Sequence, residues 1–181
     1  MKSRIFLCLG VLMLLLLAIA VPARAQQITT EKVDGVTNFK RLETTIACAG
    51  ETKPSAVAGI KKMGYASIIN LRLANEEGAD LDAEAAAAKQ AGIRYVWIPF
   101  NGAMPDPAVA DQFLTAVTAK ENEPAFIHCH SGNRAAALWM AKRMVVDHCD
   151  ADRAGEEATA LGLTSPALKQ FAIDYARTHK R

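Results

Sequence analysis

The chain has 181 residues, of which 51% are hydrophobic and 22% charged, and its formal net charge at pH 7 is +2. Residues 1–25 hold three of its 21 basic residues and no acidic one, so residues 26–181 carry 18 basic and 19 acidic side chains. A net charge near −1 offers no electrostatic support for a nucleic-acid partner, and 156 residues suit one domain with one core.

Residues 1–25 have the pattern of a secretory signal peptide. Basic residues precede a 16-residue apolar run from Ile5 to Ala20, and residues 23–25 (Ala-Arg-Ala) give a small-x-small cleavage pattern. The run is short for a membrane span, which needs about 20 residues, although an uncleaved anchor is the alternative. We expect a mature domain of residues 26–181 that is periplasmic or secreted and has no stable membrane insertion.

Along the mature chain, β-rich apolar runs alternate with helical patterns, which favours an α/β fold. In chain order we expect a strand near 39–48, a helix near 54–63, a strand at 66–72, a helix at 82–91, a strand at 93–100, a helix at 107–119, a strand at 124–129 and helices at 133–148, 152–162 and 166–178. Because the central strands each follow a helix, they should form a parallel-type central sheet of about four to five strands flanked by helices.

Residues 125–140, AFIHCHSGNRAAALWM, place a cysteine and an arginine at a strand-to-helix turn. Backbone N–H groups of the turn and of the helix start should point into one concavity, which suits an anion. Gly132 permits a tight backbone, and Arg134 can donate two hydrogen bonds to one tetrahedral oxyanion. The same donors should favour the thiolate of Cys129, whereas a buried structural cysteine beside a helix-capping turn is the alternative.

Four segments, GYASIINLR, AGIRYVWIPF, FIHCHSGNRAAALWM and EEATALGLTSPALKQFAIDYA, together resemble a known family. It is the bacterial phosphatase-like family associated with beta-lactamase hydrolase-like proteins, which is related to dual-specificity protein tyrosine phosphatases. The resemblance covers most of residues 40–178. It implies a cysteine-dependent phosphatase that hydrolyses phosphomonoesters through a cysteinyl-phosphate intermediate and needs no cofactor.

The resemblance also assigns roles to the residues of the turn. It makes Cys129 the nucleophile and Arg134 the phosphate clamp. The loop of His130, Ser131, Gly132 and Asn133 would bind the substrate through its amides. The substrate would be a phosphorylated protein or a small phosphomonoester, and we expect the protein to be a monomer.

Three features differ from typical tyrosine phosphatases. Four residues instead of five separate Cys129 from Arg134, a spacing that resembles rhodanese-type sulfurtransferases. Ala135 replaces the usual serine or threonine, and Asn101 and Gly102 stand where the family's acidic residue is expected. Two alternatives therefore stay open: a sulfurtransferase or thiol-redox enzyme, and an inactive module that binds an oxyanion.

Asp106 is the nearest aspartate to that position and is our candidate general acid. Its loop, NGAMPDPAV, follows a strand that we expect beside the FIHC strand, which would bring the loop over the anion site. Asp106-Pro107 also fits an ordinary helix start, with aspartate as the cap. Asp111 lies farther into the helix and is a weaker candidate.

The mature chain has three cysteines, Cys48, Cys129 and Cys149. Cys129 and Cys149 lie at opposite ends of one helix, about 21 Å apart, which excludes a disulfide between them and a shared zinc ion. We therefore expect no metal site, and we expect any internal disulfide to join Cys48 to Cys129.

Three further residues and one loop have simpler interpretations. Trp97 and Trp139 lie in apolar segments and should fill the core. Arg72 ends a strand and is either solvated or a second contact to the anion. Residues 75–80, NEEGAD, read as a solvated loop.

Overall fold

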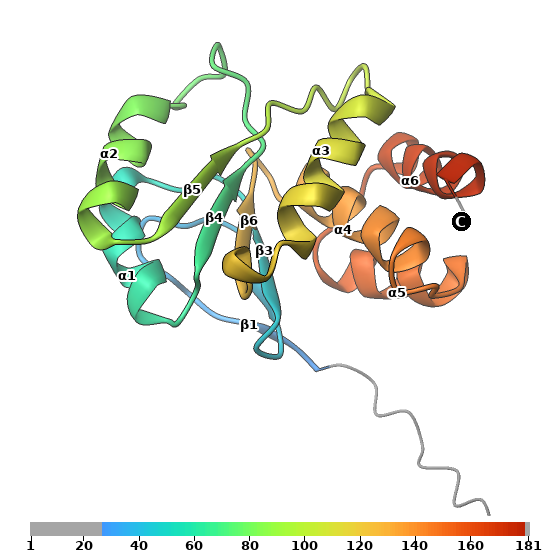
Figure 1. Ribbon diagram of the computed structural model, residues 1–181, viewed down its shortest axis with the longest axis horizontal. Helices are drawn as coiled ribbons and strands as arrows, with labels where there is room; N and C mark the ends of the chain where they lie inside the picture. Colours follow the sequence, from blue (N-terminus) through green and yellow to red (C-terminus); the bar gives the residue numbers. More distant parts are fainter. Residues whose placement is uncertain (1–26, 180–181) are drawn as a thin grey trace, which may run out of the picture.

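The structure is a computed structural model that describes residues 27–179 (Figure 1). The predicted signal peptide lies outside the described residues. Within residues 27–179, no helix combines the length and the hydrophobicity that crossing a membrane requires.

A six-stranded sheet with the order β1-β2-β3-β6-β4-β5 forms the centre of the molecule. The strands are β1 (Ile28–Thr30), β2 (Lys40–Leu42), β3 (Ile46–Ala49), β4 (Ser67–Asn70), β5 (Arg94–Trp97) and β6 (Ala125–His128). β3, β6, β4 and β5 are parallel, as predicted, whereas β1 and β2 add an antiparallel extension at one edge. β6 has a parallel neighbour on each side, so the loop that follows it leaves the middle of the carboxyl edge.

Two details of the predicted sheet were wrong. The run at 39–48 is the hairpin of β2 and β3, which brings the sheet to six strands together with the unpredicted β1. The strand at 93–100 was expected beside β6, but β4 lies between β5 and β6. β4 is buried along its whole length, whereas β5 has exposed residues at both ends, which suits β5 for the edge.

The helices lie close to the predicted ranges and cover both faces of the sheet (Figure 1). One face carries η1 (Pro54–Ala56), α1 (Val57–Lys62) and α2 (Leu81–Ala91); the other carries α3 (Pro107–Thr118), α4 (Asn133–Val145), α5 (Ala151–Ala160) and α6 (Pro166–His179), and η2 (Lys120–Asn122) precedes β6. Nine residues of α4 are buried, because this helix packs between the sheet and the outer helices. Its alanines allow that close packing.

Two hydrophobic cores lie on opposite faces of the sheet. Phe126 belongs to the smaller core under α1 and α2, and Ile127 belongs to the larger core under α3 to α6. Side chains alternate between faces along a strand. The next two residues continue this alternation: His128 contacts α2, and Cys129 joins the larger core beneath α4.

Candidate active site

Residues 129–134, which we call the cysteine loop, connect β6 to α4. Backbone hydrogen bonds hold the start of this loop between its two neighbouring strands: Cys129 N donates to Ala49 O at 3.2 Å, and Leu71 N donates to His128 O at 2.9 Å. Glu51 N donates to His130 O at 2.9 Å. The loop thus has a fixed position at the carboxyl edge of the sheet, where α/β proteins commonly bind ligands.

Cys129 lies at the bottom of the cysteine loop and is fully buried, whereas His130 and Ser131 are exposed at its mouth. The backbone N–H of Gly132 donates to Cys129 Sγ at 3.1 Å, a contact that stabilises negative charge on sulfur. Gly132 has a φ of 96°, which a residue with a side chain rarely adopts.

The start of α4 is suited to an anion because its N-cap residue, Gly132, supplies no side-chain hydrogen bond. The first N–H groups of a helix have no partner within the helix and carry the positive end of its dipole. The helix start lies close to the Cys129 thiol, because the N–H of its N-cap residue Gly132 contacts Cys129 Sγ. The structure therefore brings together the cysteine, the turn and the helix start, as the sequence indicated.

Arg134 is buried and held from one side. Its Nη1 donates to Leu71 O at 3.1 Å, to Phe100 O at 2.9 Å and to Glu76 Oε1 at 2.6 Å, and its Nη2 donates to Glu76 Oε2 at 2.7 Å. A guanidinium has five N–H donors. The hydrogen bonds to Leu71, Phe100 and Glu76 leave the Nε–H and the second Nη2–H, and Arg134 also interacts with the Cys129 thiol, so this edge could bind an oxyanion with two donors next to the sulfur.

Glu76, in the loop between β4 and α2, is the residue that holds Arg134. Its carboxylate also accepts hydrogen bonds from Leu73 N at 2.8 Å and from Arg72 Nε at 3.2 Å. Burial works to raise the pKa of Glu76, but the hydrogen bonds from Arg134 and Leu73 outweigh it and lower this pKa to about 2. Burial conversely works to lower the pKa of Arg134, and the contacts with Glu76 and Cys129 raise it overall. Both groups are therefore charged at neutral pH.

The role of Glu76 was missed because residues 75–80 were interpreted as a solvated loop. The signal that would have revealed it is its position: an acidic residue shortly after a parallel strand lies at the same sheet edge as the cysteine loop. Arg72 was also interpreted wrongly. It is 2% exposed and supports Glu76, with a second hydrogen bond to the Glu77 carbonyl, so it is not solvated, and the contact to an anion stays a prediction.

The two tryptophans differ in their surroundings. Trp139 is buried as predicted, and its indole N–H donates to Glu157 Oε1 at 2.6 Å. Trp97 was predicted in the core but is 45% exposed, because it ends the edge strand β5; its indole N–H donates to Arg72 O at 2.8 Å.

Asn133 connects the cysteine loop to the start of α6. Its Oδ1 accepts hydrogen bonds from the backbone N–H groups of Thr164 and Ser165 at 2.7 and 2.9 Å, and its Nδ2 donates to Ser131 Oγ at 3.3 Å. Its side chain is thus occupied within the protein. Only the backbone N–H of Asn133 is available for the substrate-binding role that we predicted.

Asp106 is the N-cap of α3, and its Oδ1 accepts a hydrogen bond from Ala108 N at 2.9 Å. The helix-cap interpretation is therefore confirmed, and its role as a general acid stays a prediction. Its loop begins close to the cysteine loop: a Cβ atom added to Gly102 would lie 3.3 Å from Arg134 Cγ. Asp106, four residues after Gly102 in the same loop, is exposed to solvent.

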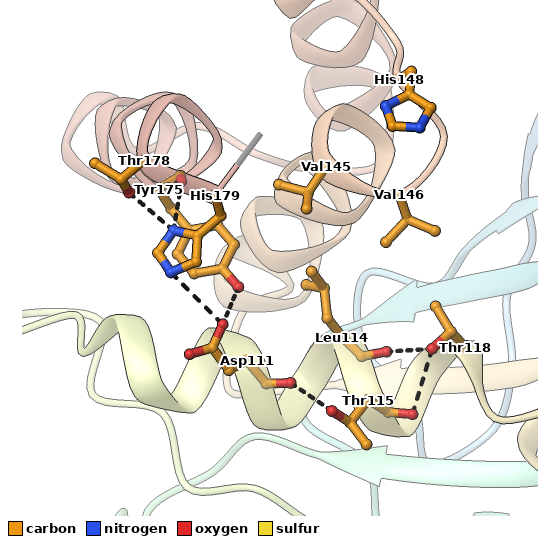
Figure 2. Close-up of a pocket in the computed structure, with 10 residues that line it drawn as sticks. All are labelled: Asp111, Leu114, Thr115, Thr118, Val145, Val146, His148, Tyr175, Thr178 and His179. Atoms are coloured by element: carbon orange, nitrogen blue, oxygen red, sulfur yellow. Dashed lines mark hydrogen bonds and ion pairs between the residues drawn. The ribbon is translucent and has the colours of Figure 1, made fainter. Parts of the chain in front are cut away.

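Asp111 faces a different part of the molecule. A cavity of about 810 Å³ lies between α3, the C-terminal end of α4 and α6, and Figure 2 shows the residues that line it. Here Asp111 Oδ1 accepts a hydrogen bond from the Tyr175 hydroxyl at 2.5 Å and lies 3.8 Å from His179 Nε2. The cysteine loop is at the other end of α4, about 18 Å away along this helix of 13 residues. The Asp111 side chain therefore links α3 to α6 and lies far from the cysteine loop.

Cys48, Cys129 and Cys149 are all free thiols. Cys48 is opposite Ile127 in the register of β3 and β6, which makes it a diagonal neighbour of Cys129 on the same face of the sheet. Burial raises the pKa of the Cys48 thiol, and the proximity of Cys129 raises it further. The predicted disulfide between the two is not formed in this structure. Residues 27–179 contain no cluster of three or more side chains suited to a metal ion.

The sequence matches a family model and two curated relatives. Residues 38–145 match the model of the beta-lactamase hydrolase-like protein, phosphatase-like domain. The beta-lactamase hydrolase-like proteins of two Xylella fastidiosa strains, Temecula1 and 9a5c, are each 33% identical over 119 residues. These matches cover 65% of this chain but only 26% of each relative, so the chain corresponds to about a quarter of those proteins.

Solved structures share the fold. The DUF442 protein of Shewanella putrefaciens has a TM-score of 0.70 at 19% identity and covers 82% of this chain and 97% of its own. TpbA of P. aeruginosa has a TM-score of 0.64 at 22% identity, with coverages of 86% and 91%. The catalytic core of the PP-IP phosphatase SIW14 of S. cerevisiae has a TM-score of 0.65 at 19% identity, with coverages of 80% and 88%.

The family model spans more than half of the chain and includes the whole cysteine loop. The segments that suggested the family from the sequence form β4, β5, β6 with α4, and much of α5 with α6. The chain therefore belongs to the family of the beta-lactamase hydrolase-like protein, phosphatase-like domain.

Proposed function

We propose that this protein is a cysteine-dependent phosphatase that hydrolyses phosphomonoesters. The observation that supports this most directly is the convergence on one point of the Cys129 sulfur, the uncapped start of α4 and the remaining edge of Arg134. A phosphoryl group placed there would have its oxygens on N–H donors and its phosphorus next to the sulfur. Preorganised donors of this kind are a major source of transition-state stabilisation.

The reaction would proceed in two steps. The Cys129 thiolate attacks phosphorus, the bond from phosphorus to the ester oxygen breaks, and the departing alkoxide or phenoxide takes a proton from an acid, for which Asp106 is our candidate. Water then attacks the phosphorus of the cysteinyl phosphate and gives its proton to the carboxylate that the acid became in the first step. The bond from phosphorus to sulfur breaks, and the Cys129 thiolate is regenerated. The products are an alcohol or phenol and inorganic phosphate, without a cofactor.

The substrate class is supported by structural relatives. TpbA was crystallised, as a variant, in complex with phosphotyrosine, and SIW14 is described as a PP-IP phosphatase. For this chain we propose a phosphorylated protein or a small phosphomonoester as substrate, acted on by a monomer. The signal-peptide pattern of residues 1–25 supports a periplasmic or secreted location for the mature protein.

One observation favours a second candidate function. Only four residues separate Cys129 from Arg134, and Ala135 follows Arg134, so the position after the arginine has no hydroxyl that would assist departure of the thiolate. A shorter loop of this kind suits a sulfurtransferase that carries a persulfide. An inactive module that only binds an oxyanion is the third possibility.

A direct comparison of substrates separates these functions. Purified mature protein is offered an aryl phosphate and, separately, thiosulfate with cyanide. We expect release of inorganic phosphate, and thiocyanate without phosphate would instead identify a sulfurtransferase. Activity with neither substrate, together with measurable vanadate binding, would identify a binding module.

The variant Cys129→Ser tests the covalent mechanism. We expect it to release no phosphate above the background rate, because a serine hydroxyl is a far weaker acid than a thiol. It should still bind vanadate, since the loop amides and Arg134 remain. Activity retained in Cys129→Ser would contradict a cysteinyl-phosphate intermediate.

A further inference from the structure

Asn38, which lies just before β2, contacts the cysteine loop from the N-terminal part of the chain. Its Nδ2 donates a hydrogen bond to Ser131 O at 3.2 Å. Asn38 is exposed, and its φ of 50° lies in the left-handed region, which asparagine adopts more readily than most residues. The backbone at this position therefore suits an asparagine, and the side chain reaches a loop that follows 93 residues later.

The two neighbours of Asn38 fix its position. On one side, Thr37 N donates to Glu51 O at 2.9 Å, which joins the segment to the chain that follows β3. On the other side, Phe39 is 1% exposed and stacks on Phe126 of β6, with the ring centroids 6.2 Å apart. Because both neighbours are held, the Asn38 amide has a defined place beside the cysteine loop.

The hydrogen bond from Asn38 acts on the peptide unit that contacts the sulfur. Ser131 O and Gly132 N belong to one planar trans peptide, so the oxygen and the N–H point in opposite directions. Asn38 binds this peptide at its oxygen, and the N–H on the other side donates to Cys129 Sγ at 3.1 Å. The outward direction of the carbonyl and the inward direction of the N–H are therefore coupled.

The chain itself does little to fix this direction. Rotation of the peptide unit between Ser131 and Gly132 changes the φ of Gly132, and glycine adopts positive and negative φ about equally well. The preceding peptide unit has its own external donor, because Glu51 N donates to His130 O at 2.9 Å. For the unit that reaches the sulfur, the external donor is the Asn38 side chain.

We propose that Asn38 is a positioning residue for the anion site: by holding Ser131 O outward, it keeps the Gly132 N–H directed at the sulfur and at a bound oxyanion. A donor that is already in place needs no reorganisation when an oxyanion binds or when charge develops. The part of this inference that concerns turnover rests on the proposed phosphatase function. The part that concerns the direction of the peptide and the binding of phosphate does not.

Asn38→Asp tests this directly, since it keeps the size of the side chain but turns an oxygen instead of an N–H toward the Ser131 carbonyl. Hydrogen exchange of the Gly132 N–H in the free protein is measured by NMR relative to the N–H of Ile127, in the middle of β6, so that a general loss of stability does not count. We expect relative exchange to be about three- to tenfold faster, because one hydrogen bond that orients the peptide is lost.

The same variant is tested for anion binding and turnover. The dissociation constant of inorganic phosphate should rise about three- to tenfold, and kcat/KM for an aryl phosphate should fall by at least as much. A side chain that only filled space at Asn38 would be replaced by aspartate without these effects.

Asn75→Asp is the matched control, because Asn75 is also exposed, lies in the loop between β4 and α2, and gains the same charge on substitution. It should leave Gly132 exchange and phosphate affinity unchanged. A folded Asn38→Asp protein with wild-type values of both would overturn the proposal, as would effects of equal size in Asn75→Asp. If Asn38→Asp does not fold, Asn38→Gly decides in its place, since glycine adopts this φ freely and removes the amide.

The exchange and phosphate-binding measurements keep the two proposals apart. Absence of phosphate release from the wild-type protein would refute the phosphatase function and leave both measurements interpretable. Faster Gly132 exchange and weaker phosphate binding in Asn38→Asp, without any phosphatase activity, would still support the role of Asn38 in the anion site.

Discussion

Replacing Glu76 with glutamine should severely reduce activity although this residue has no contact with the substrate in the proposed reaction. In the structure its two carboxylate oxygens accept hydrogen bonds from Arg134 at 2.6 and 2.7 Å. Glutamine keeps one acceptor, but its NH₂ group then faces a guanidinium N–H. One charge-assisted hydrogen bond is lost, worth roughly 1.5 to 3 kcal/mol, and Arg134 can turn away from the oxyanion.

A loss of about 1.5 to 3 kcal/mol in transition-state binding corresponds to a fall of roughly 13- to 160-fold in kcat/KM. The assay is steady-state release of phosphate from an aryl phosphate, with the affinity for vanadate measured in parallel and the melting temperature used to confirm folding. Glu77→Gln is the control, since Glu77 is the exposed neighbour in the same loop. Activity of folded Glu76→Gln within threefold of the wild type would refute the argument that Glu76 orients Arg134.

Three further predictions concern Glu76, Asp106 and Asn133. Because the pKa of Glu76 is lowered to about 2, its pairing with Arg134 should stabilise the fold fully above about pH 4.5, and this stabilisation should be lost as the pH falls through 2. The free energy of unfolding of Glu76→Gln should therefore fall less steeply with decreasing pH than that of the wild type. Identical acid-unfolding curves for the two proteins would contradict this. If Asp106 is the general acid, Asp106→Asn should lower turnover of an alkyl phosphate tenfold or more and leave turnover of an activated aryl phosphate nearly unchanged. Unchanged rates on both substrates would leave Asp106 only the role of helix cap. Asn133→Ala removes the acceptor for two backbone N–H groups at the start of α6, so we expect a lower melting temperature and weaker vanadate binding. Asn38→Ala is a milder comparison, because Asn38 Nδ2 donates one hydrogen bond to the cysteine loop, to Ser131 O at 3.2 Å. Wild-type values of Asn133→Ala in both measurements would show that its connection to α6 does not hold the loop.

The candidate site could be located from the sequence because its essential parts are local. An apolar run, a cysteine, a glycine and an arginine lie within a short stretch, and a strand followed by a tight turn and a helix has few possible geometries. The helix start signals were also local: Pro107 and Pro166 are the first residues of α3 and α6. Hydrophobic periodicity and capping depend on neighbours in the chain, so these features were predictable without a fold.

The partners of those residues were decided by the tertiary structure. Glu76 lies 58 residues before Arg134 and Glu84 lies 44 before His128, and nothing in the local pattern of either glutamate distinguishes it from a solvated surface charge. They became partners of the buried residues Arg134 and His128 because β4 pairs with β6 and α2 packs on that edge. The order of the strands depends on which strands can be buried on both faces of the sheet. This requires comparing segments that are far apart in the sequence, so no local pattern reveals it. The sequence by itself therefore located the candidate nucleophile and the candidate anion-binding turn, and only the fold determined which carboxylates contact their neighbours.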